Sequence, residues 1–372
     1  MAELAKRHQL WLLTFLEADQ GGNHGPLVEL CQAMETAPAP VRTTAKRLRQ
    51  MLLARRPDMS WRLWSPQFKA RLIARLEMVR FDIVHIEGIE MAPYLATVRK
   101  FAPQAKIIYD DHNAEWVLQY RNFNTDSKNW RRWGAAAYSF IQTQRLKRYE
   151  RWVCRQADQV VVCSEADRQA IQQLDPALPI TVVPNGVDLT RYSHYSGETI
   201  PFDLVFTGKM DYRPNIDAML WFCQEVLPRV LLQRPQTTLG IVGQRPHARL
   251  APLRKNPAVA ITGQVDDILP YIAGAKIYIA PFRVGGGTRL KLLEAMAMRK
   301  AIVATTLGAE GYPVTPGQEM VITDEPAGMA AVIVQLLHDE LARSQLGEKA
   351  YQFVQAHYRW EHLIPGLEAL YS

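Results

Sequence analysis

The sequence predicts an α/β protein of two domains, each built on a Rossmann-like parallel β-sheet. The chain has 372 residues, more than one ordinary core accommodates. Short apolar strands alternate with helical segments, which is the pattern of crossover units and parallel sheets. In the second half, Gly or Pro stands at the carboxyl end of most strands, the edge at which open α/β sheets bind ligands.

Each predicted strand is a short apolar run bounded by turn residues. In the first half these runs are 81–88, 105–112, 158–164 and 180–186, and in the second half 203–208, 237–243, 258–263, 275–281 and 300–305. A polar stretch at 189–200 separates the two series. We therefore expect an N-terminal domain at 1–190 and a C-terminal domain at 200–354, with a last helix at 355–372 packing back on the N-terminal domain.

Composition limits the class of protein without naming its ligand. Apolar residues make up 48% and charged residues 22% of the chain, as in soluble globular proteins. Neither a membrane-spanning stretch nor a signal peptide is recognisable, and the four cysteines are scattered, so we expect a cytoplasmic protein with reduced thiols. The net charge of +7 suits phosphorylated ligands, anionic membranes or nucleic acid.

The segment APFRVGGGTRLKLLEAMAMRKAIVAT, residues 280–305, carries the most chemical information. A strand ends at Pro281, and we expect a helix from Thr288 to Met298. Between them the chain has three consecutive glycines, Gly285, Gly286 and Gly287. Glycine lets the backbone approach a ligand closely, and a helix start offers free N–H groups and a positive dipole end.

Two cations stand in the first turn of that helix, where the dipole disfavours them. The positive charges of Arg289 and Lys291 destabilise the helix start unless an anion binds there, and a diphosphate would interact favourably with both. Glu294, about a turn and a half from the helix start, could accept two hydrogen bonds from ribose hydroxyls.

This segment resembles the donor-site motif of the retaining family 4 glycosyltransferases, which have the GT-B fold of two Rossmann-like domains. It is most similar to the bacterial exopolysaccharide-type members, with GTRxKxLEAMA. DDHNAE at 110–115 resembles the acceptor-side loop of the same family. Further segments match in the same order: VVVCSEADRQAI (160–171), VVPNGVDLTRY (182–192), LVFTGKMDYRPNIDAMLWF (204–222) and VDDILPYIAGAKIYIAPF (265–282). The resemblance covers nearly the whole chain.

The resemblance implies roles for single residues on the donor side. Glu294 matches the second glutamate of the family's E-x7-E pattern, which holds the ribose. Gly286 stands where the first glutamate would contact the donor sugar, so backbone N–H groups of 285–288 would have to supply part of that contact. Lys209, after Gly208, stands where the family usually has an arginine for the phosphates.

Two further residues are candidates from their place after a strand. His112 matches a histidine that the family places beside the transferring sugar, and its alternative role is to cap a turn. Glu310 either begins a helix or touches the nucleotide, and the sequence does not decide between these.

The implied activity is transfer of a sugar from a nucleotide diphosphate sugar to a glycan or lipid-linked acceptor, with retention of anomeric configuration. Lys209, Arg289 and Lys291 would stabilise the leaving diphosphate, and no DxD motif stands at a strand end, so we expect neither a metal nor a cofactor. The alternatives are a nucleotide-sugar epimerase and a non-catalytic nucleotide-sugar-binding protein of the same fold.

The N-terminus departs from the family pattern. Family members begin with a strand and a glycine-rich loop, whereas this sequence starts inside the helix that follows them, at MAELAKRH. Because the first strand of a Rossmann sheet is central, we expect the N-terminal sheet to lack its middle strand. The sequence leaves open whether Met1 is the natural start.

Two basic stretches, 42–76 and 130–152, read as amphipathic helices in which tryptophans alternate with Arg and Lys. The tryptophans are Trp61, Trp64, Trp130, Trp133 and Trp152. Such stretches are either solvated helix faces or surfaces for an anionic membrane, which would place the protein at the inner face of the membrane. We expect no nucleic-acid partner, because no recognised binding motif accompanies the charge.

Overall fold

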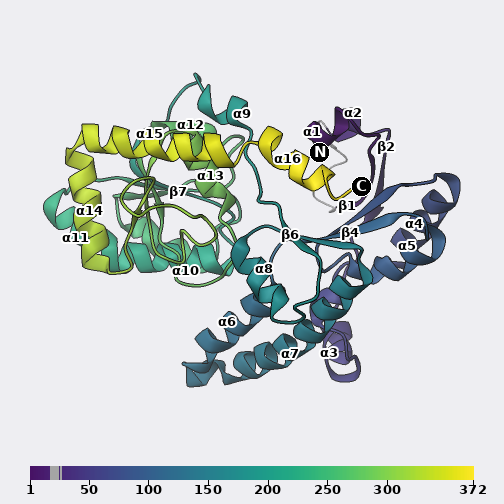
Figure 1. Cartoon of the computed structure of the whole chain (residues 1–372). Coiled ribbons are helices and arrows are strands. Elements are labelled where there is room, and N and C mark those ends of the chain that lie inside the picture. The colour runs from purple at the N-terminus through teal and green to yellow at the C-terminus, as the bar shows by residue number, and fades with distance from the viewer. Residues whose placement is uncertain (17–24, 26) are drawn as a thin grey trace. The chain divides into compact units, whose positions relative to one another are not determined.

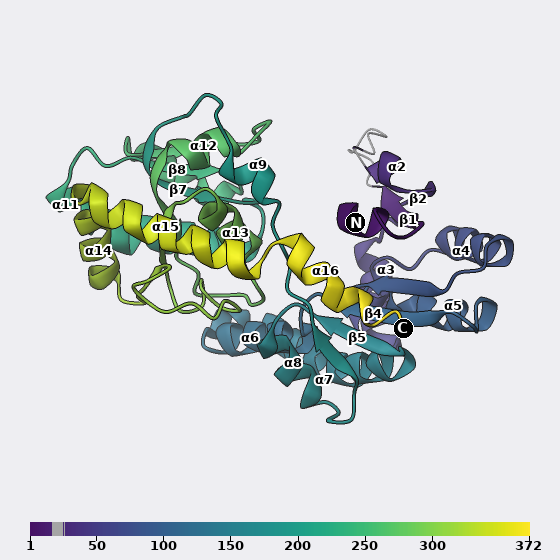
Figure 2. The same ribbon diagram turned by 45° about the horizontal axis from the view of Figure 1, so that its top comes forward.

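The computed structural model describes residues 1–16, 25 and 27–372. The chain divides into two compact units, which Figures 1 and 2 show as ribbons. Unit 1 comprises Met1–Pro184 and Ile364–Ser372, and unit 2 comprises Asn185–Leu363. The chain therefore enters unit 2 once and returns to unit 1 for its last nine residues.

Unit 2 contains a parallel sheet of six strands in the order β12-β11-β10-β7-β8-β9. The strands are β7 (Phe202–Thr207), β8 (Leu239–Val242), β9 (Val259–Ile261), β10 (Ala275–Ala280), β11 (Ala301–Ala304) and β12 (Val321–Ile322). The five predicted strands of the second half are all present, and β12 is an additional short edge strand. The prediction of a Rossmann-like parallel sheet is confirmed here.

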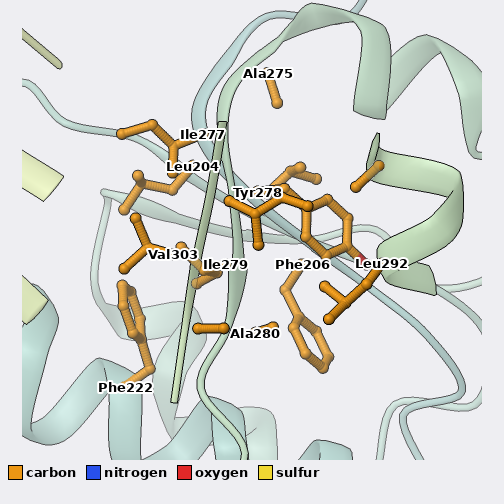
Figure 3. Close-up of a cluster of buried hydrophobic side chains, with 14 of the residues drawn as sticks. Leu204, Phe206, Phe222, Ala275, Ile277, Tyr278, Ile279, Ala280, Leu292 and Val303 are labelled. Carbon is orange, nitrogen blue, oxygen red and sulfur yellow. The ribbon is translucent and has the colours of Figure 1, made fainter. Parts of the chain in front are cut away.

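Helices cover both faces of this sheet, so its central strands are mostly apolar. Figure 3 shows the resulting core, in which Phe206 and Tyr278 are fully buried beside aliphatic side chains from β7, β10 and β11. The helices of unit 2 are α9 (Leu189–Ser193), α10 (Arg213–Trp221), a π-helical turn (Phe222–Val226), α11 (Leu227–Gln233), a 3-10 segment (Ala248–Lys255), α12 (Leu269–Gly274), α13 (Leu290–Ala297), α14 (Pro326–His338) and α15 (Glu340–His357), and α16 (Trp360–Glu368) leads from unit 2 into unit 1.

Unit 1 contains two separate parallel sheets rather than one. Four strands pair in the order β3-β4-β5-β6, and β1 pairs only with β2. The strands are β1 (Trp11–Leu16), β2 (Ala33–Pro38), β3 (Ile83–Glu87), β4 (Lys106–Asp111), β5 (Gln159–Val162) and β6 (Ile180–Val182). Among the described residues no strand lies between β1 and β3, and each of these ends a sheet, as expected for an N-terminal sheet that lacks its middle strand. β1 and β2 were not among the predicted strands.

The helices of unit 1 differ in one respect from the sequence prediction. They are α1 (Ala2–Ala5), α2 (Leu27–Leu30), α3 (Thr44–Leu53), η1 (Asp58–Trp61), α4 (Pro66–Met78), η2 (Ala92–Tyr94), α5 (Leu95–Phe101), α6 (Glu115–Ser127), η3 (Trp130–Arg132), α7 (Trp133–Gln156) and α8 (Glu165–Gln172). The stretch 42–76 is not one helix, because Pro57 and Pro66 divide it. α6 and α7 lie side by side in both views.

The C-terminal residues are held on unit 1 by polar contacts. The Tyr371 hydroxyl lies 2.9 Å from His85 Nε2, and Arg7 Nε donates to Glu368 at 2.8 Å. The expected helix 355–372 is in fact split, because α15 ends at His357 and α16 spans Trp360–Glu368.

We predict that β1 is the least protected strand of unit 1. All six of its residues are only half-buried, and a two-stranded sheet is marginal on its own. Hydrogen exchange followed by mass spectrometry should show faster exchange in Trp11–Leu16 than in Lys106–Asp111, which has a strand on either side. Equal protection of the two strands would contradict this.

Candidate functional site

The two most informative loops of unit 2 follow neighbouring strands. β7 and β10 pair in the middle of the sheet, β8 and β9 lie beyond β7, and β11 and β12 lie beyond β10. The strand order thus reverses between β7 and β10, and open α/β sheets bind ligands at the carboxyl edge of that position. The loop after β7 begins at Gly208, and the loop after β10 contains the three glycines.

Lys291 and Gly208 are in close contact at this edge. The Lys291 ammonium donates to the Thr207 carbonyl at 2.6 Å and to Asn215 Oδ1 at 3.1 Å. Gly208 has φ +151°, and a Cβ there would come within 2.5 Å of Lys291 Nζ. A residue with a side chain at position 208 would therefore displace the lysine and would also be strained at this φ.

The surroundings of the Lys291 ammonium act on its charge in opposite directions. It lies 4.3 Å from the centre of the Phe206 ring and 5.2 Å from that of Phe282, distances at which aromatic rings attract a cation. Burial, together with the positive charge of Arg289, lowers the pKa of Lys291 to about 7, although Glu294 partly offsets this. An anion bound nearby would remove the penalty.

Arg289 is buried beside this lysine, with 8% of its surface exposed. Its Nη1 donates to the Gly286 carbonyl at 2.5 Å, and its guanidinium lies 4.6 Å from the centre of the Phe282 ring. The prediction that a helix begins at Thr288 is wrong: α13 begins at Leu290, because Arg289 has the non-helical angles φ −95° and ψ 87°. Arg289 is thus the N-cap residue rather than a member of the first turn.

The backbone of the glycine-rich loop has angles that favour glycine and lies close to residue 311. Gly285 and Gly287 have φ +98° and +76°, a region that favours glycine. The structure also brings residue 311 to this loop, since a Cβ on Gly311 would come within 2.4 Å of Thr288 Cγ2. Glu310, the neighbour of Gly311, is half-buried. The predicted donor residues of the two loops are therefore gathered at one edge of the sheet.

Glu294 has a partner that the sequence analysis did not identify. The Tyr192 hydroxyl, on α9, donates to Glu294 Oε1 at 3.0 Å. Burial raises the pKa of Glu294, and the bond from Tyr192 works against that shift. Tyr192 fixes one carboxylate oxygen of Glu294, and the other keeps acceptor capacity. By contrast, Lys209 is exposed and is the least constrained of the predicted cations.

In unit 1, His112 directly follows β4 and faces two carboxylates. Its Nε2 lies 3.0 Å from Glu87 Oε2 and 3.9 Å from Asp110 Oδ1. The hydrogen bond with Glu87 raises the pKa of His112 to about 9, against the effect of burial. Burial and the charge of Glu87 raise the pKa of Asp110 to about 7. His112 is therefore positively charged at neutral pH.

The turn that carries His112 is held by two buried carboxylates from other helices. Glu150, on α7, accepts from the N–H of Glu115 at 2.7 Å and from that of Trp116 at 3.1 Å. Asp167, on α8, accepts from the N–H of Ala114 at 3.0 Å. These acceptors satisfy the free N–H groups at the start of α6 and so fix the position of the preceding turn.

Glu87, Asp110 and His112 are also the group best suited to hold a cation in the part of the chain that the structure describes. One ligand atom from each lies within 4.8 Å of the other two. Oxygen and imidazole donors of this kind suit a divalent transition metal. His112 and Glu87 are largely exposed and already paired with each other, so their geometry is equally that of an ion pair.

Several of these residues escaped the sequence analysis for a common reason. Tyr192, Asn215 and Asp167 all lie inside segments that match the family pattern, which is the one signal that could have singled them out. Glu150 has no such signal, because it lies 35 residues from the backbone it caps.

Comparison with known sequences decides the family. The family model described as Glycosyltransferase Family 4 matches residues 2–191, about half of the chain, and that described as Glycosyl transferases group 1 matches residues 201–339. This chain is a family 4 glycosyltransferase. The resemblance found in the donor-site motif is thereby confirmed.

Curated relatives are similar to this glycosyltransferase over part of their length. A 44.6 kDa protein of the cps region of Klebsiella pneumoniae is 27% identical over 42% of each chain, and a glycogen synthase of Mycobacterium tuberculosis is 27% identical over 60% of this chain and 56% of its own. A lipopolysaccharide core mannosyltransferase of Rhizobium leguminosarum is 25% identical over 60% of this chain and 67% of its own. This chain thus spans about half the length of the first two.

Solved structures share the GT-B fold with this glycosyltransferase. Sucrose-phosphate synthase of Thermosynechococcus elongatus superimposes with a TM-score of 0.68 over 98% of both chains, at 16% identity. HepE of Anabaena, solved with UDP and glucose, gives a TM-score of 0.64 over 97% of this chain and 99% of its own, at 15% identity. At these identities the likeness shows the fold alone.

We predict that binding of a nucleoside diphosphate takes up a proton at Lys291. At pH 8 the free ammonium group is largely deprotonated, and a bound diphosphate would restore its charge. Calorimetric titration in HEPES and in Tris, which differ in ionisation enthalpy, should show uptake that approaches one proton at pH 8 and vanishes below about pH 6.

The matched variants are Lys291→Met, which keeps the apolar stem, and Lys349→Ala, which removes an exposed lysine of α15. Uptake should disappear in the first and persist in the second. Unchanged uptake in Lys291→Met would assign the proton to another group.

We also predict that Glu87 raises the pKa of His112 well above the usual value of histidine. NMR of imidazole-labelled protein, with His112→Gln to assign the signal, should give a pKa of about 9. The stability that the pair contributes is fully present below the unfolded pKa of about 6.5, as long as Glu87 is ionised, and is lost as pH rises through about 9. Glu87→Gln should return the pKa toward 6.5, whereas Glu77→Gln, an exposed change on α4, should leave it at about 9.

Proposed function

We propose that this protein transfers a sugar from a nucleotide diphosphate sugar to a glycan or lipid-linked acceptor, with retention of anomeric configuration and without a metal. The observation that carries the proposal is the presence of two cations, the buried Arg289 and the half-buried Lys291, with the glycine-rich loop at the carboxyl edge of the unit 2 sheet. A ligand for this site should therefore carry negative charge that can interact with both cations.

The diphosphate of a donor meets that requirement. Its negative charge grows when the bond between the sugar and the phosphate breaks, and fixed cations in a low-dielectric site stabilise such charge strongly. Glu294, with one oxygen held by Tyr192, offers the other to a ribose hydroxyl. The structure of HepE, which shares the fold, was solved with UDP and glucose, and this supports a donor of the same class.

The sugar contacts are proposed to differ from those of family members that have two glutamates. Gly286 has no side chain, and its carbonyl already accepts from Arg289. We therefore propose that backbone N–H groups of 285–288 supply part of the contact with the sugar hydroxyls. His112, positively charged and paired with Glu87, is the proposed contact on the acceptor-side unit.

A lipid-linked acceptor would bring the enzyme to a membrane, and we propose that it works in the cytoplasm against an anionic inner membrane face. No metal is proposed, because Arg289 and Lys291 supply the charge that a bridging cation would otherwise provide. Neither an organic cofactor nor nucleic acid enters the proposal.

The proposal predicts stabilisation by one nucleoside diphosphate and turnover of the matching donor in EDTA. A thermal-shift panel of UDP, GDP, ADP and dTDP identifies the base, since a ligand at about 100 times its dissociation constant adds roughly 2.7 kcal/mol. Release of that diphosphate from its sugar donor, with membrane extract as acceptor, should fall about a hundredfold in Lys291→Met and in Glu294→Ala. Lys349→Ala should behave as wild type.

The outcomes separate the alternatives. Stabilisation without turnover would indicate a non-catalytic nucleotide-sugar-binding protein, and isomerised donor without acceptor would indicate an epimerase. Turnover that requires a divalent cation would refute the metal-independent mechanism and direct attention to Glu87, Asp110 and His112.

A further inference from the structure

The α6–α7 helix pair exposes large apolar side chains at its tip. Trp130 is 71% exposed and Trp133 65%, and they lie at the η3 turn that joins the two helices. Phe140 and Ile141, two turns further along α7, are 47% and 44% exposed. We call these four residues, with Arg131 and Arg132, the tip surface. Monomeric proteins seldom expose so many large apolar side chains together.

The apolar side chains of α7 share one face of that helix. Trp133, Ala137 and Phe140 are spaced by three or four residues and are all exposed. Further along the same face come exposed cations, Arg148, Arg151 and Arg155, of which the last two pair with Asp175. The face is therefore apolar near the tip and basic beyond it.

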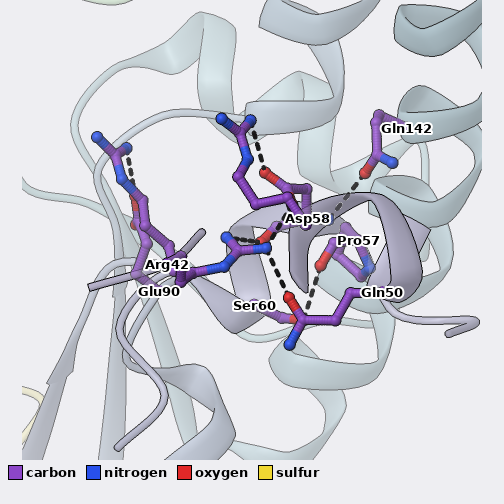
Figure 4. Close-up of polar contacts among 9 residues, drawn as sticks. Arg42, Gln50, Pro57, Asp58, Ser60, Glu90 and Gln142 are labelled. Atoms are coloured by element: carbon purple, nitrogen blue, oxygen red, sulfur yellow. Dashed lines mark hydrogen bonds and ion pairs between the residues drawn. The ribbon is translucent and has the colours of Figure 1, made fainter. Parts of the chain in front are cut away.

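The opposite face of α7 is fixed to the rest of unit 1. Gln142 Oε1 accepts from the N–H of Asp58 at 2.8 Å, and Arg42 donates to the Asp58 carboxylate at 2.7 Å and to Gln50 at 2.8 Å (Figure 4). Because this network anchors the inner face, α7 cannot rotate to bury its outer one. The tip surface is a fixed feature of the fold.

The charge around the tip surface is strongly positive. From Lys128 to Gln156 the chain has eight lysines and arginines and a single acid, the fully buried Glu150. At the tip, Arg131 lies over the Trp130 ring at 5.3 Å, and Arg132 pairs with Asp126 of α6 at 3.0 Å. The end of the α6–α7 pair thus carries an aromatic ring, from Trp130, next to a cation, from Arg131.

We propose that the tip surface docks on an anionic phospholipid bilayer. Indole rings flanked by arginines suit the boundary between lipid headgroups and acyl chains. The rings lie toward the acyl chains there, and the guanidinium groups pair with the lipid phosphates. None of the described helices is long and apolar enough to cross a bilayer, so contact from one side is the available mode.

The other basic stretch predicted from the sequence, 42–76, does not share this role. Trp61 and Trp64 are half-buried, and Trp64 stacks on Tyr94 at 5.4 Å. Arg42 is used by Asp58 within the fold. The proposal therefore narrows the expected membrane contact to the α6–α7 tip.

The inference deepens the lipid-linked acceptor of the proposed function, but its test needs no catalysis. The full chain is sedimented with vesicles of phosphatidylcholine alone and with vesicles of equal parts phosphatidylcholine and phosphatidylglycerol. Wild type should bind the anionic vesicles and should be released by high salt. Trp130→Ala with Trp133→Ala should lower the partition coefficient about tenfold or more.

A second pair of variants separates insertion from charge. Arg131→Ser with Arg132→Ser should weaken binding to anionic vesicles by about tenfold, through the lost attraction to the charged surface. Leu232→Ser, a change at an 84% exposed residue of α11, is the matched control and should bind as wild type. The tryptophan variant and Leu232→Ser should keep the melting temperature of wild type, and all variants should keep its nucleoside diphosphate shift.

Hydrogen exchange on vesicles locates the contact without any substitution. Segments within 128–144 should become protected on anionic vesicles, and α11 should not. Wild type that fails to bind anionic vesicles, a double tryptophan variant that binds unchanged, or protection elsewhere overturns the proposal. Association into dimers through Trp130 and Trp133 without vesicle binding overturns it in favour of a second copy of this chain.

Discussion

The site of unit 2 depends on one constraint, the placement of the Lys291 ammonium group among buried neighbours. Its two acceptors, the Thr207 carbonyl and Asn215, come from the end of β7 and from α10. Glycine at position 208 leaves room for the ammonium nitrogen, since a Cβ there would come within 2.5 Å of it and the lysine would have to shift. The result is a lysine whose charge is costly in the free protein and becomes favourable beside an anion.

The polar groups of the candidate site are held in place by different contacts in the two units. In unit 2 the central sheet is complete, and the loops at its carboxyl edge are held by backbone contacts and glycine geometry. In unit 1 the sheet is divided between β1-β2 and β3–β6. The turn with His112 follows β4, inside the larger piece, and gains its rigidity from Glu150 and Asp167. The position of this turn therefore does not depend on the separate β1-β2 sheet.

α7 connects two features of unit 1 that lie on opposite faces of one helix. Its inner face carries Glu150, which caps α6 behind His112, and Gln142, which holds Asp58. Its outer face carries the apolar and basic side chains of the α6–α7 tip. The rigidity that fixes the first face keeps the second exposed, so positioning of the turn and presentation of the tip arise from the same packing.

The sequence by itself determined the parallel α/β architecture, the nine strands it predicted, the missing middle strand and the glycine-rich loop with its two cations. These follow from local periodicity and from residue types whose preferences need few partners. Only the tertiary structure decided that Tyr192 holds Glu294, that Glu150 caps α6, that α13 begins after Arg289, and that the tryptophans at 61 and 64 are half-buried whereas those at 130 and 133 are exposed. Such pairings join residues far apart in sequence, 102 positions for Tyr192 and Glu294, and depend on how helices pack rather than on any local pattern.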